Sequence, residues 1–450
     1  MFHKVLIANR GEIAVRIIRA CRELGVATVA VFSEADRTAL HAQLADEAIC
    51  IGPANTADSY LNIKAILAAC EVTGADALHP GFGFLSENAA FARMCEKCGV
   101  AFIGPPASSM EQMGDKSMAK ATMKAAGVPV IPGSDGEVPS LSDARRIAEE
   151  IGYPVMVKAS AGGGGRGIRR VDAPSQLEAA LIAAKEEALR FFGDDGVYIE
   201  KFIEDPRHVE IQILADSYGN VVSLGERDCS LQRRNQKLIE ECPCPIMTPS
   251  LRKAMGQAAV KAAVACGYRS AGTVEFLLEG KEFYFMEMNT RIQVEHPITE
   301  MVTGIDLVKT QIRIAAGEPL PFRQEDVKLT GHAIECRINA ENPAQNFRPC
   351  PGRISALHMP GGPGIRIDSA VYQGCEITPY YDSMIAKLIT YAPTREEALM
   401  KMKWALAEFI VEGVDTNIDF QLNLIKDADV EAGRYDIGFL SRRKDLFPKA

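Results

Sequence analysis

Residues 272–297 read GTVEFLLEGKEFYFMEMNTRIQVEHP. Two runs of β-forming residues flank a three-residue loop that contains glycine and predict a hairpin, 273–279 and 283–289. In this register Glu275 lies opposite Glu287, and Asn289 lies on the same face. Like charges repel across a sheet unless a cation lies between them, and carboxylate and amide oxygens suit Mg²⁺ or Mn²⁺. The hairpin therefore predicts a metal site.

A solvent-exposed hairpin edge is the alternative interpretation of this stretch. The apolar side chains within the two runs favour burial instead: Val274, Phe276, Phe283 and Phe285. A polar cluster closed by a proline follows directly: Arg291, Gln293, Glu295, His296 and Pro297.

Length and composition indicate a globular protein of several domains. A chain of 450 residues exceeds what one hydrophobic core organises, so roughly two to four domains are expected. The net charge of −9 argues against general nucleic-acid binding, and no apolar run is long enough to predict a membrane span. The twelve cysteines show no paired zinc spacing, and many free thiols predict a cytoplasmic protein without a signal peptide.

Residues 1–114 alternate predicted strands and helices, which indicates a doubly wound parallel sheet. The turn after the first strand, ANRGE at 8–12, lacks the GxGxxG fingerprint of dinucleotide-binding folds. The loop HPGFGF at 79–84 follows a strand, where such sheets bind ligands, although a plain glycine–proline turn is equally compatible with it. One continuous helix is expected over 108–126, with Lys116 inside it.

A glycine run lies between two predicted strands, 153–160 with Lys158 and 168–171. Its members are Gly162, Gly163, Gly164 and Gly165. A Walker loop would need a lysine and a helix after the glycines, so we expect a mobile flap whose backbone N–H groups cover phosphates. A flexible linker is the alternative.

Two further segments carry charge. Residues 226–241 mix basic and acidic side chains, which usually indicates a solvent-exposed face. From about residue 330 the pattern is mixed α+β, with Glu335 and Arg337 in a strand. A lone arginine in a strand is more often an ion-pair partner than a catalytic group.

Together, Lys116, Lys158, the glycine flap and the carboxylate pair are suited to bind Mg–ATP. The kinase motifs HRD and DFG are absent from the sequence. Further positive charge from Lys237, Arg291 and Arg337 predicts an anionic acceptor, and Glu295 is the candidate general base.

Over essentially its full length the chain resembles biotin carboxylase, the ATP-grasp subunit of acetyl-CoA carboxylase. The matching segments are KVLIANRGEIAVRIIR at 4–19, HPGFGFLSEN at 79–88, MGDK at 113–116, 158–167, PRHVEIQ at 206–212, RDCSLQRRNQ at 227–236, MEMNTRIQVEHP at 286–297 and ECRIN at 335–339. The resemblance implies an N-terminal domain at 1–114, an ATP-grasp domain at 115–329 with a glycine-rich lid at about 131–203, and a C-terminal domain at 330–450.

The resemblance also implies a reaction in which bicarbonate attacks the γ-phosphate of ATP to form carboxyphosphate, whose CO₂ is taken by N1 of biotin. The ATP-binding residues would be Lys116, Lys158, Gly162, Gly163, Gly164, Gly165, Glu200, Lys201, Ile203, His208, Gln232 and Asn235. Two Mg²⁺ or Mn²⁺ ions would bind Glu275, Glu287 and Asn289. Bicarbonate would bind Lys237, Arg291, Gln293 and Val294; Glu295 would deprotonate it, and Arg337 would stabilise the biotin enolate.

Three positions depart from the family pattern: Asn235 for histidine, Phe82 for a tyrosine near biotin, and Pro363 for a phenylalanine at the dimer contact. The resemblance implies a homodimer that acts with a separate biotin carboxyl carrier protein and with carboxyltransferase subunits. The biotin carboxylase component of a propionyl-CoA or split pyruvate carboxylase, another carboxyphosphate-forming ligase and a non-catalytic nucleotide sensor remain alternatives.

Overall fold

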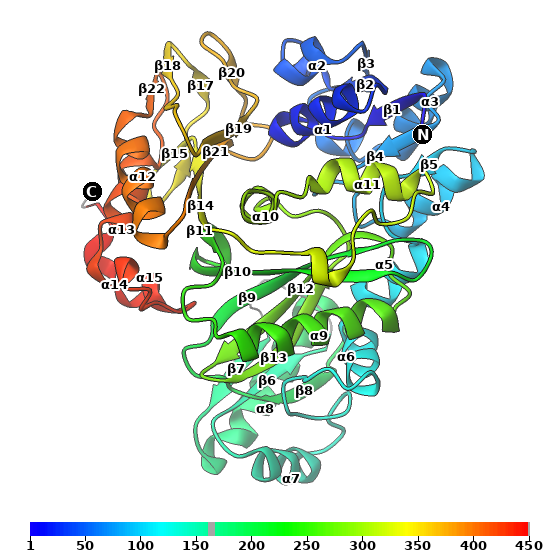
Figure 1. The fold of residues 1–450 in the computed structure, drawn as a ribbon. Helices are drawn as coiled ribbons and strands as arrows, with labels where there is room; N and C mark the ends of the chain where they lie inside the picture. Colours follow the sequence, from blue (N-terminus) through cyan, green and yellow to red (C-terminus); the bar gives the residue numbers. More distant parts are fainter. Residues whose placement is uncertain (161–166, 449–450) are drawn as a thin grey trace.

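The computed structural model describes residues 1–160 and 167–448, and its N-terminal part is a five-stranded sheet (Figure 1). Its strands are all parallel, in the order β3-β2-β1-β4-β5. The elements are β1 Lys4–Ile7, α1 Gly11–Glu23, β2 Ala27–Phe32, α2 Leu40–Leu44, β3 Glu47–Cys50, α3 Ile63–Thr73, β4 Ala77–His79, α4 Ala89–Lys97 and β5 Ala101–Phe102. Alternate residues of β1 enter two separate cores, one against α1 and one against α3 and α4, which confirms the doubly wound arrangement.

The sequence pattern did not reveal β3 or α2. Strand β3 is an edge strand whose side chains are mostly exposed. An edge strand of this kind shows little apolar alternation, and alternation is the signal from which strands are predicted.

The single helix expected over 108–126 is two helices, α5 Ala107–Gly114 and α6 Lys116–Ala125. Asp115 between them is extended, with φ −88° and ψ 113°, and its carboxylate accepts a hydrogen bond from the amide of Met118. This is an N-cap, so the chain starts a new helix at Lys116. The break places the lysine at the first position of α6 rather than in a helix interior.

A small antiparallel sheet in the order β7-β6-β8 forms the predicted lid. Its elements are α7 Leu141–Ile151, β6 Val155–Ala159, β7 Ile168–Val171, α8 Leu177–Phe192 and β8 Val197–Lys201. The two helices and three strands share a hydrophobic core of their own. The predicted flap residues Gly162, Gly163, Gly164 and Gly165 lie outside the described residues.

An eight-stranded antiparallel sheet in the order β13-β12-β9-β10-β11-β14-β21-β19 organises the remainder (Figure 1). Its strands are β9 Arg207–Ala215, β10 Val221–Arg233, β11 Gln236–Cys242, β12 Ser270–Glu279, β13 Glu282–Asn289, β14 His332–Asn339, β19 Ile365–Ser369 and β21 Met384–Ala392. Pairing of β11 with β14 carries the sheet from the central part of the chain into the C-terminal part.

The hairpin of β12 and β13 has the predicted pairing of Glu275 with Glu287, but its turn was predicted wrongly. Glu282 belongs to β13, so the turn contains only Gly280 and Lys281, and Gly280 adopts φ +59°. A register shift next to Glu275, where Phe276 pairs with Phe285, compensates for the shorter turn.

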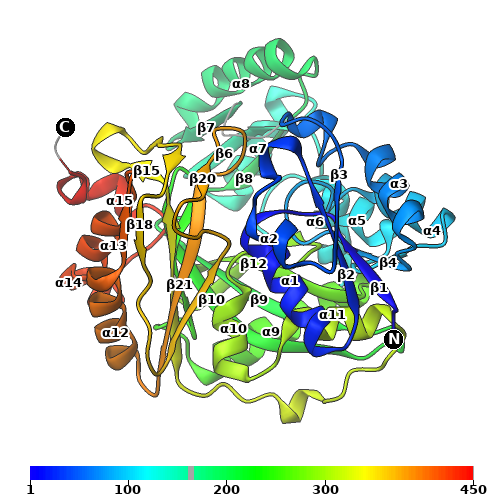
Figure 2. The same cartoon turned by 90° about the horizontal axis from the view of Figure 1, so that it is seen from above.

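Helices cover both faces of the large sheet. They are α9 Pro249–Ala265, α10 His296–Thr303, α11 Leu307–Ala315, α12 Arg395–Glu408, α13 Ile418–Ile425, α14 Ala428–Glu431 and α15 Phe439–Arg442. Alternate residues of β14 pack against α10 on one face and α12 on the other. Figure 2 shows α12 and α13 on the outer side of β21, the neighbour of β14. Within the described residues no helix combines the length and apolarity needed to span a membrane.

Short strand pairs complete the C-terminal part. They are β15 Glu341–Asn342 with β16 Arg348–Pro349, β17 Gly352–Arg353 with β20 Glu376–Ile377, and β18 Ala356–His358 with β22 Ile410–Glu412. These pairs and the four helices α12 to α15 give the mixed α+β composition that the sequence predicted.

Phe276 is fully buried and packs edge-on against Phe283, with ring centroids 5.4 Å apart. We expect Phe276→Ala to lower the free energy of unfolding by about 3–5 kcal/mol, because it leaves a cavity in the core behind the hairpin. Urea denaturation followed by circular dichroism measures this. Met400→Ala is the control, since Met400 is 61% exposed, and an equal loss in both variants would contradict the assignment of Phe276 to the core.

Candidate active site

A cavity of about 2170 Å³ lies where the N-terminal sheet, the lid and the large sheet meet. The structure brings most of the predicted site residues to its wall: Phe82, Lys116, Lys158, Glu200, His208, Gln232, Asn235, Lys237, Glu275, Glu287, Asn289, Arg291, Gln293, Val294, Glu295 and Arg337. Residues more than 250 positions apart in the chain therefore share one space. The cavity exceeds the roughly 300–1,000 Å³ of a typical ligand pocket, so it can hold more than one substrate.

Two predicted residues are not part of the described cavity wall, Lys201 and Ile203. The ammonium group of Lys201 donates to the carbonyl oxygens of Gly152 and Tyr153, at 3.0 and 3.2 Å. Its side chain therefore connects β8 to the end of α7. A part for Lys201 in nucleotide binding would have to come from its backbone.

Lysines from the lid and from α6 converge on one carboxylate in the cavity wall. Lys158 Nζ lies 2.8 Å from Glu200 Oε2, and Lys120 Nζ lies 2.9 Å from Glu200 Oε1. These cations hold the pKa of Glu200 below its ordinary value although burial alone would raise it. Lys120 was not among the predicted site residues, although its spacing of one helical turn from Lys116 and Lys124 places the three lysines on one helix face.

The carboxylate pair of the hairpin has the charge distribution of a cation site. Desolvation by the surrounding protein, and then the negative charge of Glu275, raise the pKa of Glu287, although its side chain is exposed to the cavity. Among the described residues the Glu287 carboxylate has no hydrogen-bond or ion-pair partner, and it lines the cavity. The side-chain amide of Asn289 donates a hydrogen bond to Glu275 Oε1 at 2.9 Å, so Asn289 lies next to the carboxylate pair. Glu275, Glu287 and Asn289 therefore fit a hard divalent cation as a donor set.

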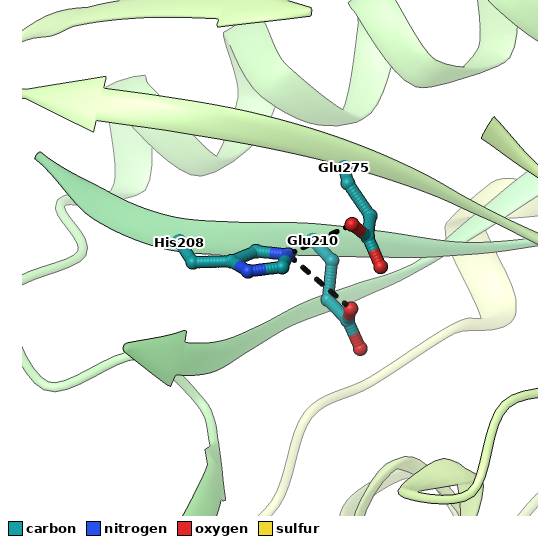
Figure 3. Close-up of side chains that lie close together, drawn as sticks. All are labelled: His208, Glu210 and Glu275. Carbon is teal, nitrogen blue, oxygen red and sulfur yellow. Dashed lines mark ion pairs between the residues drawn. The ribbon is translucent and has the colours of Figure 1, made fainter. Parts of the chain in front are cut away.

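His208 lies close to two carboxylates on neighbouring strands (Figure 3). Its Nε2 is 3.0 Å from Glu275 Oε2 and 3.9 Å from Glu210 Oε2. Burial would lower the pKa of His208, but Glu275 raises it above the ordinary value. The three residues could by composition hold a metal, yet in this structure they form an ion network with Lys237.

Glu295 lies between two cations in the cavity wall. Lys237 Nζ is 2.6 Å from its Oε1, and an Arg337 Nη2 hydrogen bond of 2.9 Å reaches its Oε2. Burial would raise the pKa of Glu295, but the surrounding cations, Lys237 first, hold it well below its ordinary value. The carboxylate is therefore ionised and can accept a proton.

Arg227 overturns the interpretation of residues 226–241 as an exposed face. Its side chain is fully buried, and its guanidinium donates to five side chains: Glu210, Gln212, Thr273, Gln293 and Thr299. The stretch forms β10 and β11 in the middle of the large sheet, so charge content alone misled the interpretation. The polar residues of HVEIQ at 208–212 alternate with apolar ones, and a period of two places them on one face of a strand. This alternation is the sequence signal that could have indicated a buried polar face beside Arg227.

The turn between β10 and β11 explains how Asn235 is tolerated. Arg234 and Asn235 both have positive φ, +50° and +65°. Asparagine adopts this left-handed backbone more readily than most residues. The turn sets Gln232 directly opposite Lys237, and both line the cavity.

The N-terminal sheet contributes the loop after β4 to the wall of the cavity. Asn9 donates to the carbonyl oxygens of Pro80 and Phe82, each at 2.7 Å, which holds Phe82 against the cavity. Gly81 has φ +64°, and a Cβ there would lie 2.9 Å from the Asn9 amide, so glycine is required. Glu87 was not predicted from the sequence; its carboxylate accepts a hydrogen bond from Arg291 Nε at 3.0 Å and orients that guanidinium.

Three family models match the chain along its length. They are "Biotin carboxylase, N-terminal domain" over residues 1–110, "Carbamoyl-phosphate synthase L chain, ATP binding domain" over 115–323, and "Biotin carboxylase C-terminal domain" over 335–442. Biotin carboxylase 1 of Bacillus subtilis is 58% identical over 442 residues, 98% of each chain. One of the pyruvate carboxylase subunits of Methanothermobacter thermautotrophicus is 56% identical over 440 residues, 98% of this chain and 90% of the relative.

A solved structure with the same fold contains ligands. The biotin carboxylase domain dimer of 2-oxoglutarate carboxylase from Hydrogenobacter thermophilus, in complex with MgADP, ADP and bicarbonate, superposes with a TM-score of 0.91. It is 52% identical, and the match covers 100% of this chain and 99% of that one.

Replacing Glu287 with lysine puts a cation where the two carboxylates face each other, so we expect Glu287→Lys to weaken Mn²⁺ binding about tenfold or more. Electron paramagnetic resonance titration of free Mn²⁺ measures the affinity. Glu282→Lys on the same strand is the matched control, because Glu282 is exposed and outside the cavity wall. Equal Mn²⁺ affinity in the two variants would show that Glu287 is not a ligand.

Proposed function

This chain belongs to the biotin carboxylase family, and from that premise we propose that it uses ATP and bicarbonate to carboxylate biotin borne on a separate carrier protein. It is an ATP-dependent carbon–nitrogen ligase. The observation that carries the proposal is the Glu295 carboxylate held between Lys237 and Arg337 in a cavity that also contains Lys116, Lys158 and the paired carboxylates.

Binding of the nucleotide would use cations from two sides of the cavity. Lys116 and Lys120 on α6 and Lys158 on β6 would neutralise phosphate oxygens. Glu275, Glu287 and Asn289 would hold Mg²⁺ or Mn²⁺, which offsets negative charge on the phosphates when bound. His208, Gln232 and Asn235 line the same region and would contact the rest of the nucleotide.

Bicarbonate would bind where Lys237, Arg291, Gln293 and Val294 meet. Glu295 would take the bicarbonate proton while an oxygen of bicarbonate attacks the γ-phosphorus, and the bond to ADP breaks to give carboxyphosphate. Lys237 and Arg337 hold Glu295 ionised, and both cations already lie where the substrate anion would enter. Charges already fixed in position would stabilise the developing negative charge without reorganisation.

Biotin would then take up the CO₂ released from carboxyphosphate, with phosphate removing the N1 proton. The guanidinium of Arg337 would face the ureido oxygen and stabilise the enolate. Glu240 accepts from Arg337 Nε at 2.7 Å and orients it. Phe82, which also lines the cavity, would offer an aromatic face to the ring system.

For its biological setting, we propose the first half-reaction of acetyl-CoA carboxylase, which leads to malonyl-CoA for fatty-acid synthesis. The pyruvate carboxylase relative at 56% identity supports a pyruvate carboxylase as the second candidate. Partners would be a biotin carboxyl carrier protein, carboxyltransferase subunits and a second copy of the chain, since the solved relative is a dimer. All twelve cysteines are free thiols, which supports a cytoplasmic location.

We further propose the domain division 1–114, 115–329 and 330–450. The ends of the three family models support it, because they fall near these positions. The pairing of β11 with β14 means that the second and third domains share one sheet.

The decisive experiment measures ADP release from ATP, Mg²⁺ and bicarbonate, with and without free biotin. Strong stimulation by biotin that disappears without bicarbonate is expected. Turnover indifferent to biotin would instead indicate another carboxyphosphate-forming ligase. Tight ATP binding without turnover would indicate a nucleotide sensor.

Glu295→Gln keeps the shape of the side chain and removes its ability to accept a proton. We expect ATP affinity to stay within about threefold while biotin-dependent turnover falls by about 10²–10⁴-fold, the usual range for a lost general base. Isothermal titration of ATP and the ADP-release assay measure the two quantities. Turnover near that of the unmodified protein would remove Glu295 from the role of base.

Arg337→Ala removes the group proposed to act on biotin. We expect carboxylation of biotin to fall by about 10²–10³-fold, with a smaller loss of the slow ATP cleavage that needs only bicarbonate. Parallel assays of ¹⁴C-bicarbonate incorporation and ADP release compare the two activities. If both fall equally, Arg337 serves the first chemical step and not the enolate.

A further inference from the structure

A buried lysine, which the proposed mechanism does not use, contacts the turn that contains the proposed base. Val294 and Glu295 form this turn, which the amide of His296 closes by donating to the Gln293 carbonyl at 3.3 Å. Lys387 on β21 donates from Nζ to the Val294 carbonyl oxygen at 2.8 Å. A side chain distant in sequence thus holds the backbone directly before Glu295.

Lys387 also joins the turn to two other parts of the fold. Its side chain has 0% exposure, and its Nζ lies 3.1 Å from Glu12 Oε1 on α1 and 3.9 Å from Asp368 Oδ2 on β19. Burial would lower the pKa of Lys387, but these carboxylates and Glu335 raise it above its ordinary value. The amine is therefore charged, and it spans the first helix, the edge of the large sheet and the turn.

Arg337 and Lys387 hold the same residue at two points. They are direct cross-strand partners on β14 and β21, so their side chains lie on one face of the sheet. Arg337 binds the Glu295 carboxylate, while Lys387 binds the carbonyl of the peptide that leads into Glu295. Two cations directly opposite each other repel, and their retention here requires the carboxylates that each one binds.

Planarity of the peptide unit makes the carbonyl contact consequential. The Val294 carbonyl and the Glu295 N–H belong to one rigid plane, so fixing the first fixes the direction of the second. The Cα atom of Glu295 lies in the same plane, so fixing the plane also fixes the point from which the Glu295 side chain extends. A small rotation of this plane would move the carboxylate of Glu295 and the backbone of Val294, which is proposed to contact bicarbonate.

We propose that Lys387 is a positioning residue that sets the Val294–Glu295 peptide for bicarbonate, while leaving the nucleotide end of the cavity unaffected. The inference rests on the proposed function, because it assigns bicarbonate to this turn. Lys387 does not itself touch the substrate. It acts through the backbone of Val294.

A purely structural buried ion pair is the competing explanation, and Arg395 provides a matched control. Arg395 donates to the buried Glu241 carboxylate at 2.7 Å and to the Val430 carbonyl at 2.9 Å, so it combines the same two kinds of contact. Glu241 follows Glu240 on β11 and points to the opposite face of the sheet. Arg395→Met therefore causes the same kind of damage in the same sheet, away from the turn.

The experiment compares Lys387→Met with Arg395→Met in the intact protein by steady-state ADP release with free biotin. For Lys387→Met we expect the KM for bicarbonate to rise about tenfold or more and the KM for ATP to stay within about threefold. For Arg395→Met we expect a lower melting temperature with both KM values within about threefold. Lys387→Met leaves the buried carboxylate of Glu12 without its ion-pair partner, so we expect this variant also to have a lower melting temperature. The double variant Lys387→Met with Glu12→Gln removes that carboxylate. We expect the double variant to recover the melting temperature while its KM for bicarbonate stays raised.

Equal rises in both KM values, an unchanged KM for bicarbonate, or recovery of that KM in the double variant would each overturn the inference. If Lys387→Met does not fold, the double variant replaces it in the comparison with Arg395→Met. Assay of the unmodified protein distinguishes failure of this inference from failure of the proposed function. If it shows no bicarbonate-dependent, biotin-stimulated turnover, the proposed function fails; if it does and only the variant pattern differs, Lys387 has no positioning role.

Discussion

Burial of charge is the constraint on which this structure depends, and Arg227 is its clearest case. A fully buried guanidinium is costly to desolvate unless its donors are satisfied, and here five side chains from β9, β12, α10 and the loop before α10 satisfy them. Those partners include Glu210 and Gln293, which in turn contact Lys237 and Glu275. The charged side chains of the site therefore form one connected network. Each cation in it is positioned by carboxylates, and those buried carboxylates are in turn stabilised by the cation.

This arrangement keeps the proposed catalytic groups in defined positions before any substrate is bound. Lys237 contacts three carboxylates, and Arg337 contacts two. Their pairing orients Glu295 and keeps it ionised, while the interior location limits screening by water. An entering anion meets cations that are already placed, and this preorganisation is the usual source of electrostatic catalysis.

Local patterns in the sequence predicted part of this and missed part of it. The pairing of Glu275 with Glu287 followed from strand periodicity, even though the turn was assigned one residue too long. The helix break at Asp115 was missed because the apolar pattern continues on both sides of it, and Arg227 was misread because burial of a charge depends on partners distant in sequence. The sequence around Lys387 did not indicate its contact with Val294, because that contact forms only where the fold brings β21 next to the turn before α10.

The separate core of the lid has a consequence for how the protein unfolds. Its strands form a sheet distinct from the eight-stranded one, and among the described residues its apolar cluster comprises side chains between positions 138 and 199. Such a unit can open on its own at a lower free energy than the whole molecule, so amide hydrogen exchange there reports a local equilibrium. A nucleotide bridging Lys158 on the lid and Lys116 on α6 would shift that equilibrium by mass action. Substrate concentration then becomes one determinant of how folded this part of the chain is.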